Sequence, residues 1–299
     1  MTKASLDLPA LQVSWTLALR SEGKAEGTVK MYNAGVNAFL RWCDATGTTP
    51  ELTKPAVRAF VAELLANGAE PATAIARQKG LRRFSAWLAE EGELDDDPLL
   101  GLKRPTEVRK VVNALSDDQL RRLLDACKGK TFTHRRDDAV MRLMMETGLR
   151  AGEAIALDVA DVDLVRGLAT VRRGKGGKGR VVPFGPQTAA AIDRYLRMRR
   201  GHRLAADSGL WLGAAGKTFG YFGLDEALKV RARQAGIEGF HLHLMRHTAA
   251  TRWLRAGGSE QGLMSVAGWS NRQMLDRYTS ASASERAADE ARGLALGDL

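Results

Sequence analysis

The feature that most limits the fold of this chain is a change of hydrophobic period just past its midpoint. Apolar residues recur at helical spacing in most segments, but residues 164–173 and 180–184 read as two short β-like runs. The stretch between them, GKGGKG (174–179), is rich in glycine and favours a tight connection. We therefore predict a mainly α-helical protein with a small antiparallel β-sheet in its C-terminal domain, built on a hairpin with a glycine-rich tip.

The helical segments fall into two groups. An acidic run ending in proline, residues 95–98, closes the first group, and residues 103–112 are charged, contain Pro105 and show no periodicity. We predict a helical bundle over residues 1–102, a linker over 103–112 and a second domain over 113–299, each long enough to bury a core. The predicted helices cover residues 28–43, 55–65, 70–90, 116–127, 139–149, 187–200, 224–234, 242–255 and 271–278.

The charge balance indicates a polyanionic partner. Lys and Arg number 45 against 35 Asp and Glu, which gives a net charge of +10, and the isoelectric point is near 9.8. Basic residues gather in four segments of the chain, at residues 77–83, 103–110, 172–180 and 194–203. Several separate patches suit a protein that wraps around double-stranded DNA.

The cysteines and the hydropathy restrict the cellular context. Cys43 and Cys127 lie far apart without metal-ligand spacing, so we interpret them as reduced thiols that fill space. No apolar run is long enough to span a bilayer, and the N-terminus does not resemble a signal peptide. We expect a cytoplasmic protein of a bacterial cell or a phage-infected host, associated with the nucleoid and without a membrane partner.

Basic side chains in three places are candidates for contact with DNA phosphates. In the predicted helix 70–90, Lys79, Arg82 and Arg83 form a cationic cluster beside an apolar stripe. A solvated surface helix is the alternative, but the basic character of the whole chain favours contact with phosphate. The other candidates lie in the linker and near the hairpin tip: Lys103, Arg104, Lys178 and Arg180.

The candidate catalytic residues begin on the predicted helix 242–255. His243 and Arg246 are three residues apart, so both side chains can reach one anion. A planar guanidinium can donate two hydrogen bonds to the charged oxygens of a phosphate in its transition state. Arg150 follows a buried helix at a glycine-containing break, and Glu153 is placed to orient it by a hydrogen bond. The alternatives are a surface His–Arg pair and an arginine that interacts with a helix dipole.

Two further side chains complete the set. Lys175, on the glycine-rich tip, can protonate a leaving oxygen if nearby cations lower the pKa of its ammonium; a simple contact with DNA phosphate is the alternative. Tyr278 follows Met274 and Leu275 at helical spacing, a pattern more common for core residues. As a nucleophile its phenol, with an ordinary pKa of about 10, needs nearby cations and an acceptor such as His243. These residues suffice to break and rejoin a phosphodiester without metal or ATP, so we predict no cofactor and no metal site.

In order and spacing these residues resemble the tyrosine recombinase (phage integrase) family. The matching segments are TGLRAGE (147–153), GKGGKGR (174–180), HLMRHT (243–248), AGW (267–269) and Tyr278, nine positions after Trp269. The resemblance is specific in the C-terminal domain. In the N-terminal bundle it extends only to size, helical character and basic charge.

The resemblance implies a role for each residue of the set. Arg150 and Arg246 correspond to the phosphate-clamping pair, Lys175 to the general acid for the leaving 5′-hydroxyl, and His243 to the hydrogen-bonding or general-base residue. Trp269 stands where most members carry a second histidine, so an indole N–H replaces a titratable group. Tyr278 corresponds to the nucleophile that forms a 3′-phosphotyrosine.

The resemblance also implies an assembly. Family members act as site-specific recombinases that close two domains around DNA as a C-shaped clamp and form a homo-tetramer on core-type sites. A C-terminal segment, here residues 285–294, docks on a neighbouring protomer. An accessory directionality factor is a further expected partner of such an enzyme.

Several alternatives stay open on the sequence. One is a DNA-binding regulator without chemistry, and another is a type IB topoisomerase that relaxes supercoils without exchanging strands. Within the recombinases, Trp269 and the divergence around it favour a phage or mobile-element integrase over an Xer-like resolvase of chromosome or plasmid dimers. Because the chain begins almost directly with the helical bundle, we expect no separate arm-site-binding domain.

Overall fold

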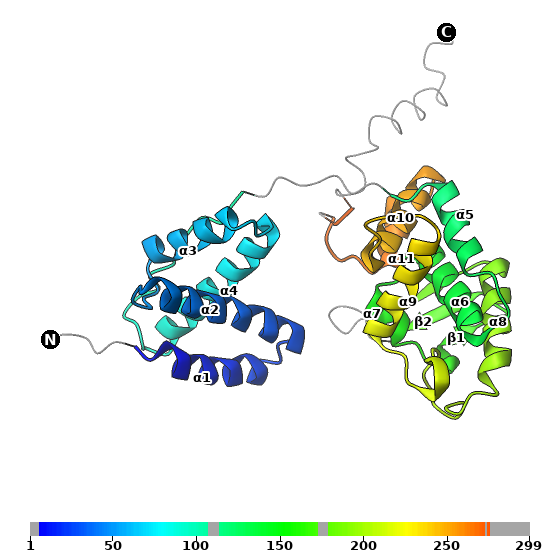
Figure 1. Ribbon diagram of the computed structural model, residues 1–299, viewed down its shortest axis with the longest axis horizontal. Helices are drawn as coiled ribbons and strands as arrows, with labels where there is room; N and C mark the ends of the chain where they lie inside the picture. The colour runs from blue at the N-terminus through cyan, green and yellow to red at the C-terminus, as the bar shows by residue number, and fades with distance from the viewer. Residues whose placement is uncertain (1–5, 107–113, 173–178, 273, 276–299) are drawn as a thin grey trace, which may run out of the picture. The chain divides into compact units, whose positions relative to one another are not determined.

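The computed structural model describes residues 6–106, 114–172, 179–272 and 274–275 (Figure 1). The chain divides into two compact units, Met1–Lys110 and Val111–Leu299, and the division falls inside the predicted linker. Each unit contains its own cluster of buried apolar side chains.

The described part of the N-terminal unit contains four helices: α1 Leu8–Ser21, α2 Glu26–Thr46, α3 Lys54–Ala66 and α4 Pro71–Glu90. The three helices predicted in this region correspond to α2, α3 and α4. Aromatic side chains fill the core, and Trp15 of α1 lies with its ring 5.0 Å from that of Phe84. The sequence pattern does not predict α1, because its outer face also carries apolar residues: Val13 and Leu17 are 65% and 63% exposed.

Two glycines allow α2 and α4 to cross closely. A Cβ atom on Gly80 would lie 2.4 Å from the carbonyl oxygen of Tyr32, and one on Gly35 would lie 2.5 Å from that of Arg77. Because the obstructing atoms belong to the backbone, the helices would have to move apart. We expect Gly80→Ala to lower the free energy of unfolding of this unit by about 1–3 kcal/mol, measured by urea denaturation.

A matched control is available in α2. A Cβ atom on Gly27 would have no neighbour within 4 Å. Since alanine is also the better helix former, Gly27→Ala should leave stability unchanged or raise it. A Gly80→Ala variant as stable as the Gly27→Ala variant would contradict the close crossing.

The chain beyond α4 stays packed on the N-terminal unit as far as Leu102. Asp97 accepts hydrogen bonds from the Ser85 hydroxyl and from the backbone N–H of Leu99. The amide of Gln78 donates to the carbonyl of Lys103 over 3.0 Å. Leu99 and Leu102 are buried in the core of this unit, so the acidic run leads into a packed segment before the linker begins.

The C-terminal unit combines helices with a small sheet, and the predicted fold class is confirmed. Its described elements are α5 Asp117–Ala126, α6 Phe132–Thr147, α7 Ala151–Ile155, the 3₁₀ turns Val159–Asp161 and Ala214–Gly216, β1 Val162–Asp163, β2 Leu168–Val171, β3 Arg180–Pro183, α8 Pro186–Arg199, α9 Tyr221–Gln234, α10 Leu242–Arg255 and α11 Glu260–Ala267. Of the predicted helix 271–278, residues 273 and 276–278 lie outside the described part of the chain.

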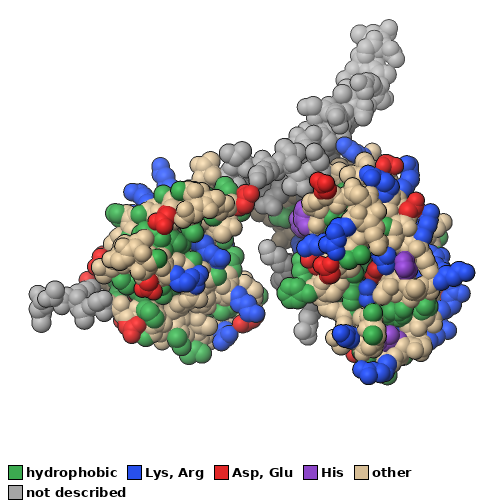
Figure 2. Space-filling model, in the orientation of Figure 1, with side chains coloured by type: hydrophobic (Ala, Val, Ile, Leu, Met, Phe, Trp, Pro, Cys, Tyr) green, Lys and Arg blue, Asp and Glu red, His purple; other side chains and the backbone are tan. Residues whose placement is uncertain are grey.

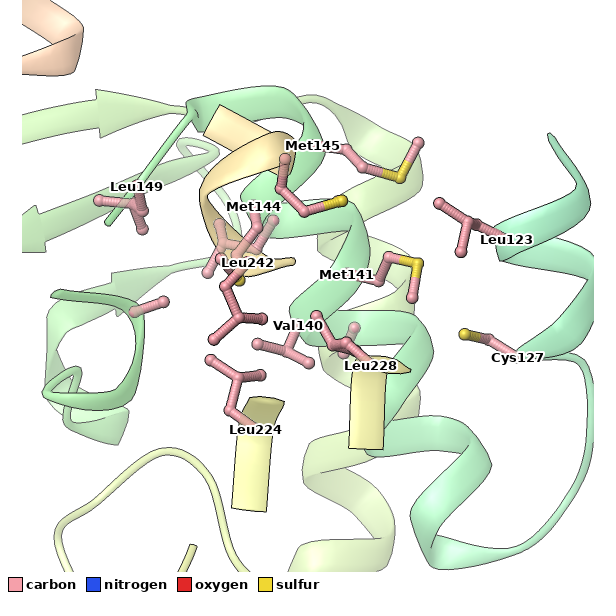
Figure 3. Close-up of a cluster of buried hydrophobic side chains, with 14 of the residues drawn as sticks. Leu123, Cys127, Val140, Met141, Met144, Met145, Leu149, Leu224, Leu228 and Leu242 are labelled. Atoms are coloured by element: carbon pink, nitrogen blue, oxygen red, sulfur yellow. The ribbon is translucent and has the colours of Figure 1, made fainter. Parts of the chain in front are cut away.

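Helix α6 runs through the centre of this unit. Its Val140, Met141 and Met144 are fully buried among leucines of α5, α9 and α10 (Figure 3). The helix begins earlier than the predicted residue 139, because the Thr131 side chain caps it by accepting a hydrogen bond from the His134 N–H. It ends at Gly148, which has the left-handed φ of 62° typical of a helix stop. The end of α6 thus places Arg150 at a fixed point on the core.

The three strands form an antiparallel sheet in the order β1-β2-β3. In the β2–β3 hairpin, Val171 is paired with Arg180, so this pair marks where the glycine-rich connection leaves the sheet. Gly167, before β2, has a φ of 64°, and a Cβ atom there would lie 2.4 Å from the carbonyl oxygen of Phe184. Only glycine fits such a position. The predicted hairpin is therefore present, and residues 173–178 of its connection lie outside the described part.

A charged cluster is buried between α6 and α9. Arg136 donates to Asp137 Oδ1 at 3.0 and 2.7 Å, and Arg231 reaches Oδ2 at 2.9 and 2.8 Å. The three side chains are 2% to 6% exposed. Arg136 also stacks on the Phe219 ring, with 3.9 Å to its centroid. One carboxylate therefore pairs with two buried guanidinium groups.

Both cysteines are buried free thiols, as expected. Burial raises the pKa of the Cys127 thiol to about 12, so it stays protonated. Among the described residues, no helix is both long enough and apolar enough to cross a membrane.

Candidate active site

Arg150 begins the site at the start of α7. Its Nη1 donates to Glu153 Oε1 over 2.8 Å, and its backbone N–H donates to Oε2 over 2.9 Å. The predicted hydrogen bond between these two residues is thus present. The Arg150 side chain is 29% exposed and Glu153 only 6%, so the carboxylate fixes the arginine from the protein side.

Arg180 is the second arginine on the same carboxylate. Its Nη1 and Nη2 donate to Glu153 over 3.0 and 2.8 Å, and its Nε donates to the carbonyl of Val266 over 2.7 Å. The side chain is 10% exposed. This placement differs from the predicted contact with DNA phosphate, because the guanidinium is turned inward onto a buried carboxylate.

Glu153 is ionised in this setting. Burial alone would raise the pKa of its carboxyl, but hydrogen bonds from Arg180 and from the Arg150 backbone outweigh it and lower the pKa to about 2. The stabilisation by this carboxylate is therefore present above its unfolded pKa of about 4.5 and is lost as the pH falls toward 2.

Arg246 is buried on α10, where it is 2% exposed. Its Nη1 donates to the carbonyl of Gly148 and its Nη2 to the carbonyl of Ala267, both over 2.8 Å. Its guanidinium carbon lies 5.2 Å from the centre of the Trp269 ring. These contacts fix the guanidinium between the end of α6, just before Arg150, and the end of α11.

His243 lies one turn before Arg246 and is exposed. Partial loss of solvent around the imidazole lowers its pKa, and the positive charges of Arg246, of His241 and His247, and of Arg150 lower it further. The ring is therefore neutral at pH 7. His243 precedes Arg246 by three residues on α10, and Arg246 binds the carbonyl of Gly148, two residues before Arg150, so the three residues share one region.

Trp269 closes the site from the side of α11. It is 6% exposed and packs in an apolar cluster with Leu254, Leu263 and Leu275. An indole at this position therefore supplies a packed wall beside Arg246.

Three predicted site residues, Lys175, Lys178 and Tyr278, lie outside the described part of the chain. The other three of the four tyrosines are described. Tyr32 is buried in the N-terminal unit, and Tyr195 is buried with a pKa raised to about 12 by that burial. Tyr221, at the start of α9, is 51% exposed.

The predicted DNA-contact residues of the N-terminal unit are at its surface. Lys79, Arg82 and Arg83 are exposed on one side of α4, opposite the buried stripe, and Lys103 and Arg104 are exposed as well. Figure 2 shows Lys and Arg side chains on the visible face of both units. The predicted division of α4 into a basic face and an apolar face is confirmed.

The described site carries an excess of positive charge. Arg150 and Arg180 pair with the carboxylate of Glu153, whereas Arg246 binds the carbonyls of Gly148 and Ala267. The three arginines and one carboxylate together carry a net charge of +2, with His243 neutral. Such a site suits a phosphate anion. Within the described ranges, no group of three or more His, Cys, Asp or Glu side chains could hold a metal ion.

The sequence reasoning missed α11, whose carboxyl end receives two of the arginines. Its signals are nevertheless present: the Ser259 side chain caps the helix, and Gly268 ends it with a φ of 64°. Charge patterning alone could not have shown that Arg180 turns inward, because its partners Glu153 and Val266 are 27 and 86 residues away.

Two family profiles match the chain, one over each unit. Residues 113–285, more than half of the chain, match the phage integrase family. Residues 13–92 match the N-terminal SAM-like domain of phage integrases. The chain belongs to the phage integrase family, the tyrosine recombinases.

Curated relatives and solved structures agree with this membership. Tyrosine recombinase XerC of Chromobacterium violaceum is 30% identical over 261 residues, which cover 86% of this chain and 85% of the relative. XerC of Pseudomonas aeruginosa is 30% identical over 268 residues, covering 87% and 86%. A lambda integrase dimer bound to a COC′ core site has a TM-score of 0.72 at 15% identity, covering 90% of this chain and 94% of that one. The XerA recombinase has a TM-score of 0.54 at 23% identity, covering 94% and 98%.

The relatives establish the activity class, and the solved structures establish the fold. This tyrosine recombinase is an enzyme of site-specific DNA recombination. The predicted enzyme class is confirmed.

Proposed function

We propose that this recombinase cuts and rejoins DNA strands at short core-type sites through a 3′-phosphotyrosine on Tyr278. The observation that carries the proposal is the convergence of Arg150, His243 and Arg246, from two separate segments, on one cationic region next to Trp269. A binding protein without chemistry has no need for a neutral imidazole beside two fixed guanidinium groups.

The proposed step is a transesterification. The Tyr278 oxygen bonds to phosphorus while the bond from phosphorus to the 5′-oxygen breaks, and a strand hydroxyl later reverses the exchange. The number of phosphoester bonds is unchanged, so no ATP is needed. The phenol proton passes to the neutral His243, and the Lys175 ammonium protonates the leaving oxygen. Arg150 and Arg246 stabilise the charge that develops on the phosphate oxygens.

The lowered pKa of His243 predicts the pH dependence of cleavage. Because the neutral imidazole is the proton acceptor, the single-turnover rate should fall as the pH drops through a midpoint below the ordinary value of 6.5. His243→Gln should be slower at every pH and lack this fall. A midpoint that persists in His243→Gln would assign the titration to another group.

Duplex DNA is the partner that the surface charges favour. The exposed cluster of Lys79, Arg82 and Arg83, together with Lys103 and Arg104, is suited to backbone phosphates, and Lys178 is a further candidate from the sequence. Structural neighbours include the lambda integrase dimer on a core site and XerH on a palindromic difH substrate. A homo-tetramer on DNA, with an accessory directionality factor, remains part of the proposal.

A nicked suicide substrate tests the chemistry. Cleavage next to the nick releases a short fragment, which leaves a covalent protein–DNA adduct that resists denaturant. Tyr278→Phe should form none, whereas Tyr221→Phe, which changes the one exposed residue among the described tyrosines, should form it at the parental rate. Adduct formation by Tyr278→Phe would refute the proposal.

Two biological settings fit this activity. The indole at Trp269 favours an integrase of a phage or mobile element. The match to XerC relatives over 86% and 87% of the chain favours an Xer-like dimer resolvase as the second candidate. Mapping covalent cleavage positions separates them: sites that flank the gene as attachment sites support the integrase, and a single chromosomal site supports the resolvase.

A further inference from the structure

Arg180 connects three segments of the site that are distant in sequence. It is the first residue of β3, and its guanidinium reaches Glu153 of α7 with two hydrogen bonds and Val266 of α11 with a third. The same carboxylate holds Arg150. One side chain therefore ties the sheet to both the α7 and the α11 sides of the site.

The contact with α11 is tight. A Cβ atom on Gly268 would lie 3.0 Å from the Arg180 guanidinium, so the guanidinium lies against the turn that leads from α11 into Trp269. Val266 and Ala267, adjacent carbonyls at the end of this helix, accept from Arg180 and Arg246 respectively. Cations at a helix carboxyl end are favoured by the helix dipole. A shift of Arg180 would therefore displace the end of α11 and, with it, Arg246 and Trp269.

We propose that Arg180 is a positioning residue for DNA cleavage. Through Glu153 it holds Arg150, and through the end of α11 it holds Arg246, so that both guanidinium groups face one phosphate. Arg180 itself makes no contact with that phosphate. This inference rests on the proposed function and assigns Arg180 a role different from a DNA contact.

Only arginine can make this connection. A guanidinium presents its N–H groups in a rigid fork, so it can bind a carboxylate with two bonds and a carbonyl with a third. A lysine keeps the charge but is a single point donor on a flexible stem. Arg180→Lys should therefore behave nearly as poorly as Arg180→Ala.

The first measurement compares cleavage rate with DNA affinity. Because small displacements of catalytic groups cost on the order of 10²-fold in rate, we expect Arg180→Ala and Arg180→Lys to slow single-turnover cleavage by about that factor. The slope of log affinity against log salt concentration should stay unchanged, whereas loss of a true phosphate contact lowers it by about 1. Arg166→Ala removes an exposed arginine of the same sheet region and should cleave at the parental rate. A parental rate for Arg180→Ala, or a lower salt slope, would overturn the proposal.

Modified substrates identify the step through which Arg180 acts. In a methylphosphonate, a methyl group replaces one non-bridging oxygen, so the phosphate loses its charge and depends less on the clamping arginines. In a 5′-phosphorothiolate, sulfur leaves without needing a general acid. The loss of cleavage rate in the Arg180 variants, relative to the parental protein, should become smaller on the methylphosphonate and stay the same on the phosphorothiolate. If the rate defect of the Arg180 variants became smaller on the phosphorothiolate, or stayed the same on the methylphosphonate, Arg180 would not act by positioning the phosphate-clamping arginines.

Two controls keep the result interpretable. Thermal unfolding by circular dichroism sets an assay temperature at which each variant is folded, and Arg180→Lys serves if Arg180→Ala does not fold. The Tyr278→Phe variant tests the proposed function independently of the Arg180 variants. If Tyr278→Phe is inactive while Arg180→Ala cleaves at the parental rate, only the positioning role fails; if Tyr278→Phe forms the adduct, the proposed function itself fails.

Discussion

Replacing Asp137 with alanine is expected to lower the free energy of unfolding of the C-terminal unit by about 3–5 kcal/mol, because it leaves buried charges without their partner. Asp137 is the carboxylate between Arg136 and Arg231, and all three are almost completely buried. The loss should appear as a lower midpoint in urea denaturation followed by tryptophan fluorescence.

The control for this prediction is a carboxylate in an exposed pair. Asp193 of α8 lies 3.2 Å from Arg197 one turn on, with both side chains at least half exposed. Because surface pairs contribute little, Asp193→Ala should change stability by less than about 1 kcal/mol. If the two variants unfold at the same urea concentration, the buried cluster does not stabilise the fold as described.

Replacing Arg246 is expected to have the largest effect on catalysis among the described residues. Removing one fixed donor to a transition-state oxyanion typically costs on the order of 10²–10³-fold in rate. We expect at least that loss for Arg246→Ala in single-turnover cleavage. Arg246→Lys should recover little of it, since lysine cannot span the Gly148 and Ala267 carbonyls while facing the phosphate.

A second arginine on the same helix provides the comparison. Arg252 of α10 is 49% exposed and pairs with Asp117 at 3.3 Å. Arg252→Ala removes the same charge from the same element, so it should retain cleavage within about threefold, as expected for a surface residue. A comparable loss in both variants would mean that net charge, and not the placement of Arg246, governs the rate.

Much of the fold could be predicted because local patterns and tertiary structure agree. Apart from 271–278, which is described only in part, each predicted helix has a counterpart in the structure, and the switch to β-like runs marks β2 and β3. Helix α1 escaped prediction because Val13 and Leu17 carry apolar character onto its exposed face. In such a helix, the alternation between core and solvent that reveals a helical period is lost.

In the active site, contacts between residues close in sequence could be predicted, and contacts between distant segments could not. The pairing of Arg150 with Glu153 was predictable, because residues three apart at a helix start face one another. The inward turn of Arg180 was not, since its partners come from α7 and α11. A basic residue in a basic segment looks like a DNA contact until a buried carboxylate is found opposite it. The Asp137 cluster could not be predicted for the same reason, because Arg231 is 94 residues away from Asp137 in the sequence.

The most direct test of the account is to identify the residue that becomes linked to DNA. Trypsin should cleave after Arg277 and Arg286, so the linked peptide is expected to be YTSASASER (278–286), with Tyr278 at its first position and its only other hydroxyls on serine and threonine. Nuclease digestion of the suicide-substrate adduct, followed by fragment-ion mass spectrometry, should place the remaining nucleotide on Tyr278. A nucleotide on any other residue, or an active recombinase that forms no covalent adduct, would contradict the account.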